Sequence, residues 1–281
     1  MKRTLIALIS VVLSSCPAHA DSCPVEQYTN ELSRIRAQDV NAVVKAANEL
    51  IKISADRDDP CRDQLMHEFR SYYRAALSAY EKKSRVGGWE YPAADSDRLE
   101  FEQTIASAGW SLRESEGIYC LGEKPGWFEE RFNTILTRPF KRYVRIRAEE
   151  IHHGFARDAG LLISWEQLRE RIATWEQFLR TYPDFVEKSE IRDLLDVYVR
   201  VFLTGMDNAR IHNFNSKKLN PDVKAAYEMF IRENRDSAYY KLVREYYAML
   251  KSKQFNVPDD IAEYVKKQGG EALFDAQPPA Y

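Results

Sequence analysis

Apolar residues recur at every third or fourth position along most of this chain, and that spacing limits what the chain can fold into. Between positions 165 and 179 the apolar face is made of Trp165, Leu168, Ile172, Trp175 and Leu179. This interval places the side chains on one side of an α-helix, whereas a half-buried strand needs alternation at every second residue. Runs of strict alternation are missing. We therefore predict an all-α protein.

Capping residues and helix breakers divide this pattern into separate helices. Ser164 and Gln167 form a capping box at the start of the clearest helix, and Pro183 ends it. Further helices are expected over 61–84, near 96–116, from Pro125, over 140–158 and 191–204, and from Pro221, residue 239 and Pro258. About ten helices with short connections predict an array of helical hairpins, in the style of an α-solenoid or a bundle.

The first twenty residues differ from the rest of the chain. Lys2 and Arg3 precede an apolar run over 5–13 that is too short for a permanent membrane anchor, and small residues surround a cleavage point after Ala20. We expect a signal peptide over these residues and release into the periplasm. The alternative is a lipoprotein, because the residues up to Cys16 resemble a lipobox. No later segment approaches twenty apolar residues, so no integral membrane segment is expected.

After the leader, the chain is expected to contain an N-terminal helical region over 21–160 and a C-terminal helical-hairpin region over 161–270. Residues 271–281 are expected to form a flexible tail. The formal net charge of −2 is spread over mixed signs without a basic stripe, so no nucleic-acid partner is expected.

Three cysteines remain after removal of the leader, and an oxidising compartment favours one disulfide. A single straight helix after Cys23 would carry Cys61 about 45 Å away. Asp39 can cap a new helix, which would return the chain antiparallel to the first. We therefore predict a Cys23–Cys61 disulfide and a free Cys120.

Two segments of the C-terminal region echo one another. Residues 175–184 read Trp-Glu-Gln-Phe-Leu-Arg, then Tyr-Pro-Asp, and residues 227–236 read Tyr-Glu-Met-Phe-Ile-Arg, then Asn-Arg-Asp. Each is followed by a second amphipathic helix. Over residues 164–250 this signature resembles the helical hairpins of bacterial envelope tetratricopeptide-like proteins. The repeat offset is 52 residues rather than the 34 of true tetratricopeptide repeats, so the resemblance implies hairpin packing and not a regular peptide groove.

Candidates for chemistry are few. Glu149 and His153 share a helix face at a spacing that zinc ligands use, but no third ligand accompanies them, and a solvated polar face explains them better. The 43 acidic residues offer many carboxylate pairs, and no spacing selects one. Cys120 has no neighbouring histidine in the sequence. We therefore predict no metal, no cofactor and no catalytic residue.

A long loop is the leading candidate for partner binding, because loops of this length often carry function. It covers residues 205–215, and Asp207 and His212 within it are able to pair as a base and its orienting group. The alternative is structural, with its apolar residues fastening the loop over a helix junction. The proposed partner-contacting residues of the loop are Asp207, Asn208, His212 and Asn213.

Trp89 and Tyr91 form a second candidate in a glycine-rich segment. They serve either as exposed anchors for a partner or as plugs in the core. Together these features predict a periplasmic, non-catalytic protein-binding protein, an adaptor or an immunity protein against a toxin that acts in the periplasm. The alternatives are an envelope enzyme acting on cell-wall or lipid substrates and an outer-membrane lipoprotein scaffold.

Overall fold

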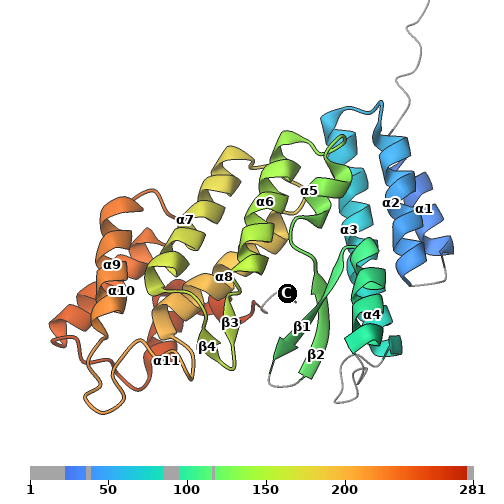
Figure 1. The fold of residues 1–281 in the computed structure, drawn as a ribbon. Helices are drawn as coiled ribbons and strands as arrows, with labels where there is room; N and C mark the ends of the chain where they lie inside the picture. Colours follow the sequence, from blue (N-terminus) through green and yellow to red (C-terminus); the bar gives the residue numbers. More distant parts are fainter. Residues whose placement is uncertain (1–22, 36–38, 85–94, 116–117, 277–281) are drawn as a thin grey trace, which may run out of the picture.

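The fold is an array of helices with two small β-hairpins (Figure 1), seen in a computed structural model that describes residues 23–35, 39–84, 95–115 and 118–276. The helices are α1 (Val25–Arg34), α2 (Val40–Ser54), α3 (Asp59–Ser84), α4 (Asp95–Ser107), α5 (Trp127–Phe132), α6 (Arg138–His152), α7 (Trp165–Thr181), α8 (Lys188–Thr204), α9 (Pro221–Glu233), α10 (Tyr240–Ser252) and α11 (Ile261–Val265). The predicted all-α helical array is confirmed. The expected leader with Cys16, and the pair Trp89 and Tyr91, lie outside the described residues.

A disulfide fastens the start of α1 to α3. Asp39 caps α2, accepting a hydrogen bond from the Ala42 amide at 2.9 Å. The chain therefore reverses after α1, as predicted, and both α1 and α2 pack against α3. Cys23 and Cys61 form the predicted disulfide, with their Cα atoms 5.5 Å apart. Closing a loop of 38 residues stabilises the fold by about 3–4 kcal/mol in the chain-entropy model.

The helix expected near 96–116 is shorter than predicted, and a β-hairpin follows it. The hairpin pairs β1 (Trp110–Ser115) with β2 (Ile118–Glu123) in antiparallel register. Gly109 ends the helical segment with a φ of +78°, a backbone conformation that favours glycine. Contacts from α3 then hold the hairpin: the Tyr73 hydroxyl donates to the Gly109 carbonyl at 2.6 Å, and Glu81 accepts from the Leu121 amide at 2.8 Å.

The helix expected over 140–158 also ends early. α6 stops at His152, and the chain turns into a second small hairpin of β3 (Ala156–Arg157) and β4 (Gly160–Leu161). Cys120, the predicted free cysteine, is indeed unpaired and lies half-buried in β2.

The C-terminal hairpins follow the predicted helix boundaries closely. The capping box of Ser164 and Gln167 opens α7, Gly205 ends α8, and Pro221 stands in the first turn of α9. The C-terminal tail differs from the prediction. Residues 266–270 form a π-helical turn and Glu271–Phe274 a 3-10 turn that packs on α8 with Leu273 buried. The part of the expected flexible tail up to residue 276 therefore belongs to the folded protein.

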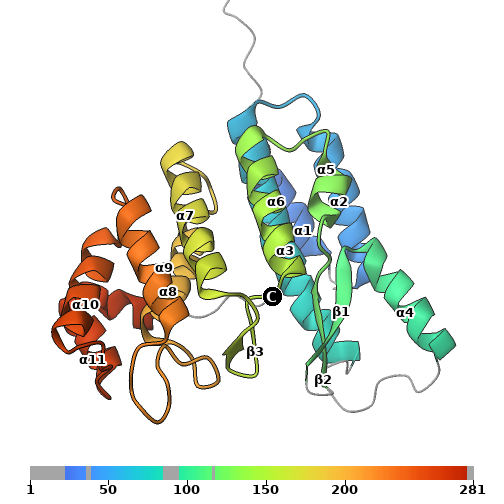
Figure 2. The same cartoon turned by 60° about the vertical axis from the view of Figure 1, so that its left-hand side comes forward.

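One continuous cluster of buried apolar side chains joins the two halves of the array. In Figures 1 and 2, α1–α6 with β1 and β2 occupy one side, and α7–α11 occupy the other. α6 packs against α7 through aromatic rings, with the Tyr143 ring centroid 5.7 Å from that of Trp175 and 6.3 Å from that of Phe178.

Candidate functional site

The predicted loop lies at one end of the molecule, where three connecting segments meet. We call residues 156–161, 205–220 and 253–259 the loop surface; it lies at the lower end of the view in Figure 1. Backbone hydrogen bonds join the segments: the Asn208 amide donates to the Ala159 carbonyl at 2.9 Å, and the Leu219 amide donates to the Phe255 carbonyl at 2.9 Å. The three segments are thus a single hydrogen-bonded unit and not independent loops.

Backbone strain is concentrated on this surface. Among the residues that the structure describes, the non-glycine residues with positive φ are Asp158, Ala159, Lys217, Gln254 and Phe255. All five belong to the loop surface. A positive φ costs a residue with a side chain free energy, and such residues cluster at ligand-contacting sites when the surroundings hold them in place. These positive φ values, held by the surrounding hydrogen bonds, give the loop surface a defined backbone shape.

The tip of the central loop presents an aromatic ring to solvent. The Asn213 side chain accepts hydrogen bonds from the amides of Asn215 and Ser216, each at 3.0 Å, which fixes a tight turn. Phe214, in this turn, is 66% exposed. The Arg210 guanidinium lies 4.8 Å from the centre of the Phe214 ring. The turn therefore displays an aromatic ring stacked with a cation, two residue types that dominate binding hot spots.

The four predicted contact residues share this surface but have different roles. Asp207 and Asn213 are exposed, His212 is half-buried, and Asn208 donates its side-chain amide to the Asp158 carbonyl. The pairing of Asp207 with His212 does not form in the described structure; the His212 ring instead lies 3.0 Å from the Asn213 carbonyl. Of the apolar residues expected to fasten the loop, Ile211 is buried, whereas Phe214 points into solvent.

The histidine-containing end of α6 has no metal-binding geometry. Glu149 and His153 line a small cavity of about 200 Å³. No group of three His, Cys, Asp or Glu side chains capable of holding a metal ion occurs among the described residues.

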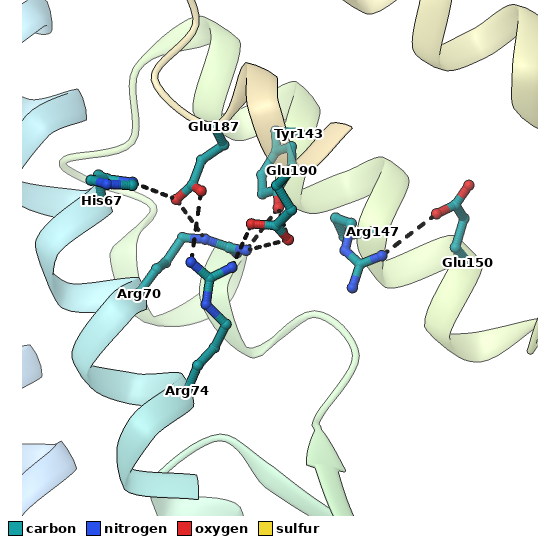
Figure 3. Close-up of polar contacts among 8 residues, drawn as sticks. All are labelled: His67, Arg70, Arg74, Tyr143, Arg147, Glu150, Glu187 and Glu190. Atoms are coloured by element: carbon teal, nitrogen blue, oxygen red, sulfur yellow. Dashed lines mark hydrogen bonds and ion pairs between the residues drawn. The ribbon is translucent and has the colours of Figure 1, made fainter. Parts of the chain in front are cut away.

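Sequence reasoning missed a buried network of charged side chains in the middle of the molecule (Figure 3). Arg70 of α3 lies 3.1 Å from Glu187 and 3.4 Å from Glu190, at the start of α8. Its guanidinium also donates to the Tyr143 hydroxyl of α6 at 2.7 Å, and this hydroxyl donates to Glu190 at 3.0 Å. Arg74 pairs with both carboxylates. The network therefore joins α3, α6 and α8.

A second buried ion pair lies further along α6, beside a cavity. Arg147 lies 3.8 Å from Glu150, and the Trp175 indole donates to Glu150 at 2.9 Å. Burial raises the pKa of Glu150 against the opposing effect of Arg147. Glu150 lines a cavity of about 740 Å³ between the β1–β2 hairpin and the end of α6. Cys120 lines it too, but burial raises the pKa of its thiol and so disfavours the nucleophilic thiolate.

His67 adds a pH-dependent contact to the network. Its ring lies 3.2 Å from Glu187, a contact that raises the pKa of His67 above 6.5, although burial opposes the shift. Because the pKa of His67 is higher in the folded protein than in the unfolded chain, protonated His67 stabilises the fold. This contribution is complete at pH values below the unfolded-state pKa and is lost as the pH rises through the folded-state pKa.

Replacing His67 with glutamine should therefore destabilise the protein more at pH 5.5 than at pH 8.5. Urea unfolding of both proteins at both pH values measures this difference, and an equal loss at both would contradict it.

Comparison of the chain with protein-family models, with curated proteins and with solved structures finds no match. The resemblance to envelope tetratricopeptide-like hairpins therefore stays a prediction. Among the described residues, no helix has the length and apolar character needed to cross a membrane.

Proposed function

We propose that this protein is an exported, non-catalytic protein that binds another protein through the loop surface. The observation that carries the proposal is Phe214, 66% exposed at the tip of a loop held in place on both sides. An exposed aromatic ring on a mobile loop would have no fixed shape for a partner to recognise. Here Asn213 and the neighbouring segments fix the turn before any partner arrives, which lowers the entropic cost of association.

The chemistry of the surface favours a protein partner over a small molecule. Phe214 and Arg210 project from a protruding turn, whereas small-molecule sites are concave and bury most of their ligand. Aromatic residues and arginine are the types enriched at the centres of protein–protein interfaces.

The proposed compartment is the bacterial periplasm. The leader-like residues 1–20 and the Cys23–Cys61 disulfide support this assignment, since disulfides persist in oxidising compartments. An adaptor for envelope machinery and an immunity protein that neutralises a periplasm-acting toxin both fit such a binding surface. An envelope enzyme would instead need a reactive group, and burial raises the pKa of the Cys120 thiol that lines the cavity of about 740 Å³ beside Glu150.

Site-specific photocross-linking tests the proposal. The photoreactive amino acid p-benzoylphenylalanine is placed at Phe214, and as a matched control at Leu99, an apolar residue of α4 that is 58% exposed. Irradiation of cells producing each variant should give one discrete adduct from position 214 and none from position 99. The adduct should disappear when Arg210 is also changed to alanine.

Other outcomes would reject the proposal. Equal adduct patterns from both positions would show that exposed apolar residues of this protein cross-link without selectivity. No adduct at position 214, with correct folding shown by circular dichroism, would remove the loop surface as the contact. An adduct found only in cytoplasmic extracts would contradict the periplasmic assignment.

A further inference from the structure

A line of basic side chains runs along α6. This line was not among the features predicted from the sequence. Arg138, Lys141, Arg142 and Arg145 follow at helical intervals of three and four residues, so they share one face. All four line a groove of about 870 Å³, whose other side is formed by α7 and residues 233–236. The groove lies on different elements from the loop surface.

Most of this positive charge has no internal partner. Arg145 pairs with Glu129 at 2.6 Å, which accounts for one cation. Lys141 donates to the neutral amide oxygen of Asn133 at 2.8 Å. Within the described part of the chain, no carboxylate lies within ion-pair distance of Arg138 or Arg142, and both are exposed. Uncompensated cations gathered in a concave site focus a positive potential, although the whole chain has a net charge of −2.

We propose that this groove binds an extended, acidic segment of a protein, with carboxylates at alternate residues facing α6. Arg138 and Arg142 are separated by about 6 Å along the helix axis, at a rise of 1.5 Å per residue. Alternate residues of an extended chain project to the same side at intervals of about 6.6–6.8 Å. Two carboxylates separated by one residue therefore match the two guanidinium groups. This inference does not depend on the proposed function of the loop surface.

The opposite wall determines what stands between the carboxylates. It is formed by Phe178, Tyr182, Thr174 and Gln177 of α7 and its C-terminal end. Residues that alternate with the acidic positions point to this side of an extended chain. An apolar or aromatic side chain there would pack against the half-buried Tyr182. The ligand is therefore an acidic–apolar–acidic segment.

The same wall argues against nucleic acid as the occupant. Glu233 and Asp236 line the groove opposite α6, and each pairs with an arginine, so the uncompensated positive charge is confined to the α6 side. The basic line from Arg138 to Arg145 spans only about 10 Å of helix. Nucleic-acid sites need a positive surface that follows several phosphates along the backbone. A short peptide segment meets both limits.

Fluorescence anisotropy tests this inference with two fluorescein-labelled peptides, Gly-Glu-Tyr-Glu-Val-Glu-Gly and the same peptide with glutamine at every glutamate. We expect the acidic peptide to bind the wild-type protein, with an affinity that falls as salt is raised because added ions screen exposed charges. The variant Arg138→Glu with Arg142→Glu should bind at least tenfold more weakly, and so should the glutamine peptide to the wild-type protein.

A matched control separates the groove from general electrostatics. Lys241→Glu with Arg244→Glu makes the same change in net charge on exposed residues of α10, away from the groove, and should alter the affinity less than twofold. Circular dichroism confirms that each variant is folded, and the pair Arg138→Gln with Arg142→Gln replaces the glutamate pair if the latter unfolds.

Three results would overturn the proposal. The first is an unchanged affinity in the folded groove variant, and the second is an equal loss in the α10 control. The third is tighter binding of a labelled thymidine oligonucleotide, or of phosphatidylglycerol vesicles, that is lost in the groove variant. That last result would keep the groove as an anion site but replace the acidic peptide as its ligand.

Discussion

Changing Trp175 to alanine is expected to lower the free energy of unfolding by about 5 kcal/mol, the largest single effect we anticipate. Trp175 is fully buried, and its ring centroid lies 5.7 Å from those of both Tyr143 and Phe178. Removing the indole opens a cavity where α6 meets α7. The change also removes the hydrogen bond at 2.9 Å to the buried carboxyl of Glu150.

Trp175→Phe separates the two contributions. Phenylalanine retains most of the ring packing but donates no hydrogen bond, so it should cost about 1–3 kcal/mol, the penalty for the polar group left without its partner. Phe214→Ala is the surface control and should change stability by less than about 0.5 kcal/mol. Urea unfolding followed by circular dichroism measures all three. A loss below about 1 kcal/mol for Trp175→Ala would show that this aromatic junction is not part of the cooperative core.

Changing Arg70 to alanine is expected to cost about 3–5 kcal/mol, because it leaves two carboxylates without their buried partner. Arg70 is 2% exposed and contacts both Glu187 and Glu190. Burial alone would raise the pKa of Glu190, but Arg70, Arg74 and Arg147 hold it well below its usual range. Without Arg70, the attraction that offsets the burial of these charges is largely lost.

An exposed ion pair provides the comparison for Arg70. Lys52 lies 3.6 Å from Glu49, with their side chains 78% and 36% exposed, so Lys52→Ala should cost no more than about 1 kcal/mol. Chemical unfolding at pH 7 compares the two variants. Similar losses for Arg70→Ala and Lys52→Ala would contradict the buried network as a stabilising link between α3 and α8. A further expectation is that added salt changes the loss of stability caused by Lys52→Ala, whereas the loss caused by Arg70→Ala stays nearly the same.

The buried network also bears on the proposed binding surface. Glu187 and Glu190 stand at the first turn of α8, and the loop of residues 205–220 begins where α8 ends. A helix fixed at one end by Arg70 and Arg74 carries that orientation to its other end. The position of the loop surface relative to α1–α6 therefore depends on contacts at the opposite end of α8.

Local signals in the sequence determined much of the fold. The capping box of Ser164 and Gln167, the cap at Asp39 and the first-turn Pro221 each act within one helical turn, so they can be read without knowing the tertiary structure. The Cys23–Cys61 disulfide was predicted from one such signal, because a new helix that begins at Asp39 allows the chain to reverse. The two ends of the loop over residues 205–215 were also predicted from local signals of this kind.

Only the tertiary structure decided the features that depend on distant residues. The segment after Gly109 forms a strand that pairs with β2, and α3 holds this hairpin through Tyr73 at the Gly109 carbonyl and Glu81 at the Leu121 amide of β2. A strand of six residues gives too short an alternation to outweigh the helical pattern around it. Arg70 and Glu187 are 117 residues apart, so no spacing rule connects them. Short-range signals record hydrogen bonds along one helix, whereas the charge network, the hairpins and the α6 groove arise from packing between elements that the chain brings together only on folding.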